Sequence, residues 1–141
     1  MPDRIQLSDS KQWGQRMTVV LEGLRVLVVE DDPELRNLTQ VILEEEGVLV
    51  RAAAQGSEAL CLLDGFEPHV ALLDARLPDT TGAELGVALA ARNPLCAQVL
   101  VSGDSDGVIE WQQRGGLALP KPYEIDDLLA LVRHAAARQA A

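Results

Sequence analysis

The chain has 141 residues, the size of one ordinary domain, and 48% of them are hydrophobic. Aromatic residues make up only 3%, so the core must consist of Leu, Val and Ala. The formal net charge of -10 argues against nucleic acid and against an anionic membrane as partners, because both are bound by clustered Lys and Arg. The first residues are polar and of mixed charge, and no apolar run approaches transmembrane length, which predicts a cytoplasmic protein.

Short apolar segments predict strands that are buried on both faces, as in a parallel sheet. Three segments are apolar almost throughout and two are weaker; in chain order they span residues 26–29, 50–54, 70–73, 99–101 and 117–119.

Helical patterns separate these strands. The first helix has the strongest signal, because Asp32 can cap it, Pro33 suits its first position and Gly47 can end it. Four further helices are expected at 57–64, at 83–92, at 107–114 in a short or irregular form, and from 124 into the Ala-rich end of the chain. Cys61, in the apolar part of the second helix, is predicted to be a small core residue.

Strand and helix thus alternate five times, which predicts an α/β fold with a doubly wound parallel sheet and helices on both faces. This unit is expected over residues 24–138, with a short tail at 139–141. Residues 1–23 are expected to form an N-terminal extension, either a tail or, from the helical spacing of Trp13 and Met17, a short helix. The length leaves no room for an effector domain, so the unit is expected to act alone.

Polar residues stand at the ends of four strands, where ligands of open α/β sheets bind. The expected group is Glu30, Asp31 and Asp32 after the first strand, Asp74 after the third, Ser102 after the fourth and Lys121 after the fifth. Carboxylates packed together need a cation, and a purely oxygen ligand set favours Mg²⁺ or Mn²⁺. With a lysine and a hydroxyl facing an anion, the group indicates phosphoryl transfer onto an aspartate.

Each of these residues also has an ordinary explanation when it is taken alone. The acidic run can be a solvated loop with a helix cap, Asp74 and Ser102 can be turn residues, and Lys121 can be an exposed lysine. Their joint placement at strand ends is what favours a functional site.

The same residues lie in motifs whose order and separation resemble those of the receiver domain of bacterial two-component response regulators. The matching stretches are 26–33 (VLVVEDDP), 72–74 (LLD), 77–79 (LPD) with Gly82, 101–103 (VSG) and 121–123 (KPY). The resemblance covers about residues 24–138 and implies a flavodoxin-like five-stranded sheet in the order 2-1-3-4-5.

By this resemblance, Asp74 is the phosphorylated residue and a ligand of Mg²⁺. Asp31 would bind the ion directly, Glu30 would act on it through water, and the backbone carbonyl of Arg76 would be a further ligand. The phosphodonor would be a histidine kinase or a histidine phosphotransfer protein. A downstream protein would receive the signal, with the oligomeric state open between a monomer and a homodimer.

The resemblance also implies a phosphoryl-binding pair. Ser102 would bond a phosphoryl oxygen and report phosphorylation, and Lys121 would pair with Asp74 or with the phosphoryl group. Pro122 would follow a cis peptide bond. We also hypothesise that Arg76 and Asp104, each two positions after a site residue, form an ion pair that tunes the lifetime of the phosphorylated state; two unrelated surface charges are the alternative.

Two features depart from the family pattern. The interval of 19 positions from Ser102 to Lys121 is a few residues shorter than usual, which predicts a shortened or irregular fourth helix. Ala118 stands where an aromatic switch residue is common, and Trp111 either replaces that residue or is an ordinary packing residue.

Two alternative functions follow from these residues. A degenerate receiver would act as a constitutive interaction module, which the altered switch region favours. An aspartate-nucleophile phosphatase would need a second aspartate two positions after the first, where this chain has Arg76. The chain is therefore not expected to be an enzyme, apart from catalysing its own phosphorylation and dephosphorylation.

Overall fold

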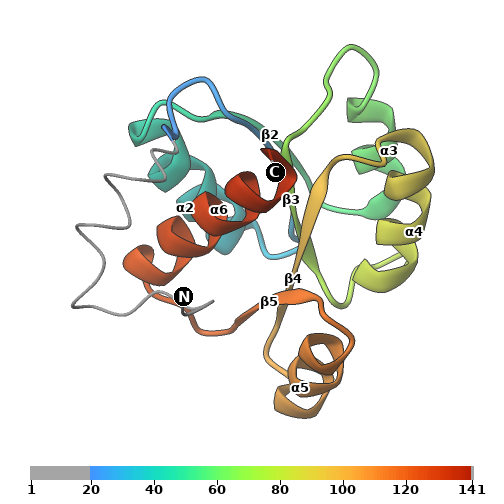
Figure 1. Cartoon of the computed structure of the whole chain (residues 1–141). Coiled ribbons are helices and arrows are strands. Elements are labelled where there is room, and N and C mark those ends of the chain that lie inside the picture. Colours follow the sequence, from blue (N-terminus) through green and yellow to red (C-terminus); the bar gives the residue numbers. More distant parts are fainter. Residues whose placement is uncertain (1–19, 141) are drawn as a thin grey trace.

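A computed structural model describes residues 20–140 of the chain. Its centre is a five-stranded parallel sheet in the order β2-β1-β3-β4-β5 (Figure 1). The strands are β1 (Arg25–Val29), β2 (Leu49–Ala53), β3 (Val70–Asp74), β4 (Ala97–Ser102) and β5 (Leu117–Pro120). The helices are α2 (Pro33–Glu45), α3 (Gly56–Leu62), α4 (Gly82–Arg92), α5 (Ser105–Gln113) and α6 (Ile125–Ala140). The predicted α/β class and the strand order 2-1-3-4-5 are confirmed.

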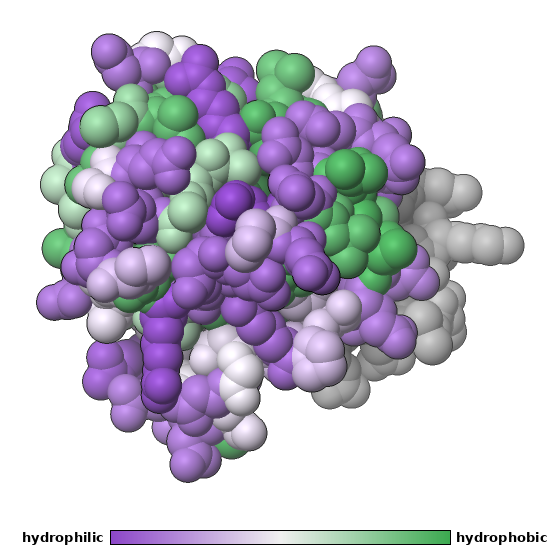
Figure 2. Space-filling model, turned by 180° about the vertical axis from the view of Figure 1, so that it is seen from behind, coloured by the Kyte–Doolittle hydropathy of each residue, from purple (hydrophilic) through white to green (hydrophobic). Residues whose placement is uncertain are grey.

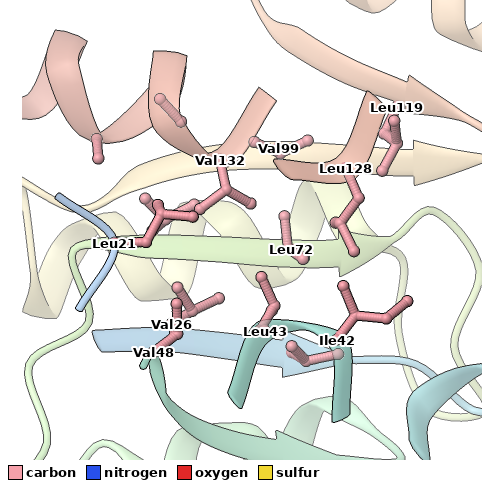
Figure 3. Packing of buried hydrophobic residues seen from close by; sticks show 14 of the residues in the cluster. Leu21, Val26, Ile42, Leu43, Val48, Leu72, Val99, Leu119, Leu128 and Val132 are labelled. Carbon is pink, nitrogen blue, oxygen red and sulfur yellow. The ribbon is translucent and has the colours of Figure 1, made fainter. Parts of the chain in front are cut away.

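The sheet separates two apolar layers, because successive side chains of a strand point to opposite faces. Val26 of β1 belongs to the layer beneath α2 and α6, and its neighbour Leu27 belongs to the layer beneath α3 and α4. Figure 3 shows the first layer, in which Leu72 of β3 lies beneath Val132 of α6. Burial on both faces is why these strands are apolar almost without interruption.

The start and end of α2 follow from three residues. Asp32 accepts a hydrogen bond from the backbone N–H of Glu34 at 3.1 Å, and Pro33 occupies the first helical position. Gly47 follows the helix with φ of 85°, a conformation that glycine adopts at little cost. The acidic run after β1 is therefore fixed at the sheet edge by a helix that begins immediately behind it.

The structure corrects two details of the helices. Helix α5 begins at Ser105, two residues earlier than predicted, because Asp104 caps it by accepting from the backbone N–H of Asp106 at 3.2 Å. It has nine residues and Val108 is its one buried residue, which agrees with the expectation of a shortened helix. The prediction that Cys61 is a core residue was wrong: Ala59 of the same helix points into the core, whereas Cys61 is exposed.

Described residues continue beyond the expected unit of 24–138 at both ends. Leu21, within the expected N-terminal extension, is buried in the first layer (Figure 3). Helix α6 continues to Ala140, past the expected end at 138. The predicted amphipathic positions Trp13 and Met17 lie outside the described residues.

The surface seen from behind is mostly hydrophilic, with separate apolar patches (Figure 2). Val87 and Leu95 are among the large apolar residues that are exposed. Within residues 20–140, none of the helices combines the length and the apolar character needed to cross a bilayer.

At the amino end of the sheet, His69 joins β1 to β3. Its Nδ1 atom accepts a hydrogen bond from the backbone N–H of Arg25 at 3.0 Å. Burial, and secondarily the charge of Arg25, lowers the pKa of His69 below its ordinary value of 6.5. Because the folded state disfavours the imidazolium, the stability from this contact is present above about pH 6.5 and is lost as the pH falls through the folded-state pKa.

We therefore expect His69→Asn, which keeps an acceptor at the same place but does not titrate, to flatten the loss of stability between about pH 7 and about pH 5. The effect should be below about 1 kcal/mol, since His69 is only partly buried. Urea unfolding at each pH measures it. Parallel pH profiles for the two proteins would contradict this assignment.

Candidate functional site

The carboxyl ends of β1, β3 and β5 bring an ammonium group against two carboxylates. The Nζ atom of Lys121 lies 2.8 Å from Oε1 of Glu30 and 3.3 Å from Oδ2 of Asp74. The backbone N–H of Lys121 donates to the carbonyl of Ser102 at 2.8 Å, and the Lys121–Pro122 peptide bond is cis, as the resemblance implies. The sequence expectation that these side chains meet at one edge therefore holds in the fold.

Three acidic residues form a cluster around this lysine. Glu30, Asp31 and Asp74 each offer a carboxylate oxygen, and these oxygens all lie within 4.8 Å of one another. Glu30 and Asp74 are only 5% and 6% exposed, whereas Asp31 faces solvent. Three carboxylates beside one ammonium group leave an excess of negative charge. This cluster of oxygen ligands fits a hard divalent cation such as Mg²⁺ or Mn²⁺.

The electrostatics of the cluster centre on Asp74. Burial raises the pKa of Asp74 to about 7, with further contributions from hydrogen bonds to Glu30 and Asp31. A hydrogen bond with Asp74 lowers the pKa of Asp31. Burial opposes the charge on Lys121, but Glu30 and Asp74 outweigh it and raise the pKa of the ammonium group. Burial and the neighbouring acids therefore favour the neutral form of Asp74, whereas the charge of Lys121 favours its carboxylate.

Backbone contacts hold Glu30 in its inward position. Its Oε2 atom accepts from the backbone N–H of Asp32 at 3.1 Å, and its carbonyl oxygen accepts from the guanidinium of Arg36 at 2.9 Å. Asp32 itself caps α2 and does not join the cluster. Of the three consecutive acidic residues, two thus face the site and one serves the helix.

A cavity of about 340 Å³ opens beside Asp74 and Ser102. Ser102 is buried at the end of β4, where its Oγ atom accepts from the backbone N–H of Asp104 at 3.0 Å. Arg76 and Asp104 also line the cavity, but within residues 20–140 they do not form an ion pair. The backbone N–H of Arg76 donates to Oδ1 of Asp74 at 3.3 Å. The arrangement gives a small anion a space between a carboxyl group and a hydroxyl.

Two residues of the matched motifs have roles that the sequence did not reveal. Asp79 caps α3, a different element, by accepting from the backbone N–H groups of Gly56 and Ser57 at 2.8 and 2.9 Å. Gly82 lies against the backbone of Asp74, and a Cβ atom there would overlap the carbonyl oxygen of Asp74. Both residues fix the loop after β3. Their place in the motif was the only signal for them in the sequence.

Trp111 does not lie in this site. Its indole N–H donates to the carbonyl of Leu117 at 2.8 Å, at the start of β5. It lines a separate groove with Pro94 and Arg138. Ala118 is buried within β5. This contact with the start of β5 supports the interpretation of Trp111 as a packing residue.

The two histidines also lie away from the site. His69 precedes β3 at the opposite end of the sheet, as expected, and His134 is part of α6.

The family model of the response regulator receiver domain matches residues 26–133 of the chain.

Two known proteins with related sequences are named as transcriptional regulators. The DNA-binding transcriptional regulator NtrC of Proteus hauseri is 34% identical over 113 residues, which are 78% of this chain and 24% of that protein. The transcriptional regulatory protein TrcR of Mycobacterium tuberculosis is 32% identical over 124 residues, 78% of this chain and 44% of that protein. The chain thus spans less than half of these relatives.

Among solved structures, a CheY-like response regulator receiver domain protein from Methanospirillum hungatei has a TM-score of 0.75 and 29% identity, covering 84% of this chain and 98% of that chain. The chemotaxis response regulator CheY4 of Vibrio cholerae has a TM-score of 0.72 and 24% identity, covering 80% and 98% of the two chains. The second likeness concerns the fold alone.

The acidic cluster predicts that Mg²⁺ stabilises the protein. For a dissociation constant near 1 mM, about 10 mM MgCl₂ should add about 1.4 kcal/mol to the free energy of unfolding. Asp31→Asn should abolish most of this gain, because it removes a ligand of the cluster. Thermal unfolding in MgCl₂ and in NaCl of equal ionic strength measures the difference.

The neighbouring Asp32 offers a matched control. Asp32→Asn keeps a good helix cap and lies outside the cluster, so the gain in MgCl₂ should persist. Equal losses in the two variants would argue against the assigned cation site.

Proposed function

Because the chain belongs to the family of response regulator receiver domains, we propose that it accepts a phosphoryl group on Asp74 from a histidine kinase or a histidine phosphotransfer protein. The observation that carries this proposal is the convergence of Lys121 with the acidic cluster beside the cavity at Asp74. Receiver domains of this family work with such kinases and with downstream effectors.

In the proposed reaction, an ionised oxygen of Asp74 bonds to phosphorus as the bond from phosphorus to the donor imidazole breaks, and the imidazole leaves with that electron pair. Mg²⁺ or Mn²⁺, held by Asp31 and Asp74, with Glu30 through water and the carbonyl of Arg76, would supply positive charge against the phosphoryl oxygens. A protonated carboxyl group is a poor nucleophile. Because burial raises the pKa of Asp74 to about 7, this side chain must ionise before it attacks phosphorus.

Two further side chains would bind the phosphoryl group once it is on Asp74. Lys121 lies 3.3 Å from Asp74, so its ammonium group needs little movement to pair with a phosphoryl oxygen. Ser102 accepts from Asp104 and, in the described part of the chain, its own proton is given to no other group. That proton can be donated to a phosphoryl oxygen.

The signal would leave the site through β4 and α5. Ser102 is joined through Asp104 to the start of α5, a helix with a single buried residue. A helix with so few buried contacts can shift at low cost when the loop before it moves. The output in this proposal is a protein contact with a downstream target.

The two alternatives remain distinct proposals. A degenerate receiver would keep the fold without being phosphorylated, and the buried Ala118 gives it some support because no aromatic side chain can rotate there. A phosphatase would release phosphate repeatedly from a small ester. Arg76, which stands where such an enzyme needs its second aspartate, opposes that function.

The test is labelling with radioactive acetyl phosphate in the presence of Mg²⁺. We expect label on the wild type and none above background on Asp74→Asn, since the amide is not a nucleophile. Asp32→Asn is the control and should be labelled like the wild type. Label that survives Asp74→Asn would reject the acceptor, and multiple turnover on p-nitrophenyl phosphate would favour the phosphatase.

Arg76 and Asp104 should tune the lifetime of the phosphorylated protein. Both line the cavity through which water must reach the phosphoryl group, so Arg76→Ala should speed hydrolysis several-fold, within the range of about 1 kcal/mol for an exposed charge. Loss of label after removal of the donor measures the rate. Arg92→Ala, remote from the cavity, should leave it unchanged, and an unaltered lifetime in Arg76→Ala would refute this role.

A further inference from the structure

Buried polar groups single out one residue that the proposed reaction does not use. In the part of the chain that the structure describes, four polar or charged residues are buried, namely Glu30, Thr39, Asp74 and Ser102. Three of them form the site at the strand ends. Thr39 instead lies within α2, on its buried side. Because a polar group is costly to bury without a partner, its hydrogen bond is informative.

The partner of Thr39 is Tyr123. The Thr39 Oγ1 atom and the Tyr123 hydroxyl oxygen lie 2.6 Å apart, in a hydrogen bond that either group can donate. Burial raises the pKa of the Tyr123 phenol, which therefore stays a neutral hydroxyl. The Tyr123 ring packs against the apolar layer beneath α2 and α6. The bond connects residues 84 positions apart in the sequence.

This bond joins the segment that carries Lys121 to the helix that follows the acidic run. Tyr123 follows Lys121 by two residues, and Thr39 belongs to the helix that begins directly after the acidic run. The same helix holds Glu30 through Arg36, whose guanidinium donates to the Glu30 carbonyl. The helix that carries Thr39 therefore also holds the backbone of Glu30, the residue whose carboxylate Lys121 contacts at 2.8 Å.

We infer that the Thr39–Tyr123 hydrogen bond is a positioning device for Lys121. The lysine side chain has four rotatable bonds, so the placement of its ammonium group depends on where the segment 121–123 is held. One anchor of that segment is the Lys121 N–H on the Ser102 carbonyl, and the Tyr123 hydroxyl on Thr39 is the second. The catalytic consequence rests on the proposed function, whereas the placement of Lys121 does not.

The chain allows this placement to be observed directly. It contains two lysines, Lys11 and Lys121, so a sample labelled with ¹³C at lysine Cε gives two side-chain signals, which Lys11→Arg assigns. Tyr123→Phe and Thr39→Val each remove the bond. Trp111→Phe is the matched control, because it removes a different aromatic hydrogen bond, at the other end of β5.

We expect Tyr123→Phe and Thr39→Val to move the Lys121 signal in the same direction, and the double variant to move it no further. Trp111→Phe should leave this signal in place even if it lowers the melting temperature. A Lys121 signal unchanged in Tyr123→Phe would overturn the inference, as would an equal change in the control.

Phosphorylation by acetyl phosphate gives the second readout. Tyr123→Phe should slow labelling about five-fold, the factor that corresponds to about 1 kcal/mol for one hydrogen bond. In a Lys121→Ala background the same substitution should change the rate by less than about two-fold, because it acts through the lysine. A five-fold loss that persists in that background would refute the positioning role. If the wild type is never labelled, the proposed function fails, and the lysine signal still decides the inference.

Discussion

The arrangement of this protein depends on one electrostatic constraint, the packing of three carboxylates around a single ammonium group at the end of a buried sheet. Glu30 and Asp74 are nearly inaccessible, and the contacts of 2.8 and 3.3 Å to Lys121 are the only ion pairs they make in the described chain. A charge removed from water is tolerated only when it is paired and hydrogen-bonded. The remaining negative charge makes the site receptive to a cation, and burial raises the pKa of Asp74, so that its charge is costly to keep without one.

The helices beside the site hold its loops in place, because the first turn of each helix needs a capping residue. Asp32 and Asp104 begin α2 and α5 within two residues of Glu30 and Ser102, and Asp79 caps α3 from the loop that follows Asp74. The loops at this edge are thus held by helix termini, whose free N–H groups require acceptors. Rigid loops keep the carboxylates together in spite of their mutual repulsion.

The helices differ in how firmly buried contacts hold them to the sheet. The layer beneath α2 and α6 is extensive and is tied to the site through Thr39 and Tyr123. Helix α5 contributes only Val108 to the interior. A phosphoryl group that binds Ser102 would therefore act on a helix with a single buried residue, while the side that carries Lys121 stays fixed.

The sequence by itself determined the order of the elements and the chemistry at the strand ends. Apolar runs such as 26–29 are typical of strands buried on both faces, and parallel strands place Asp74, Ser102 and Lys121 at one edge of the sheet. The tertiary structure alone decided the contacts made across the chain. Asp79 capping α3, Gly82 leaving room for the Asp74 carbonyl and Tyr123 reaching Thr39 join residues that no local pattern connects. The exposure of Cys61 was likewise decided by how α3 is rotated against the sheet, because five consecutive apolar residues, 59–63, do not mark which face of a short helix is buried.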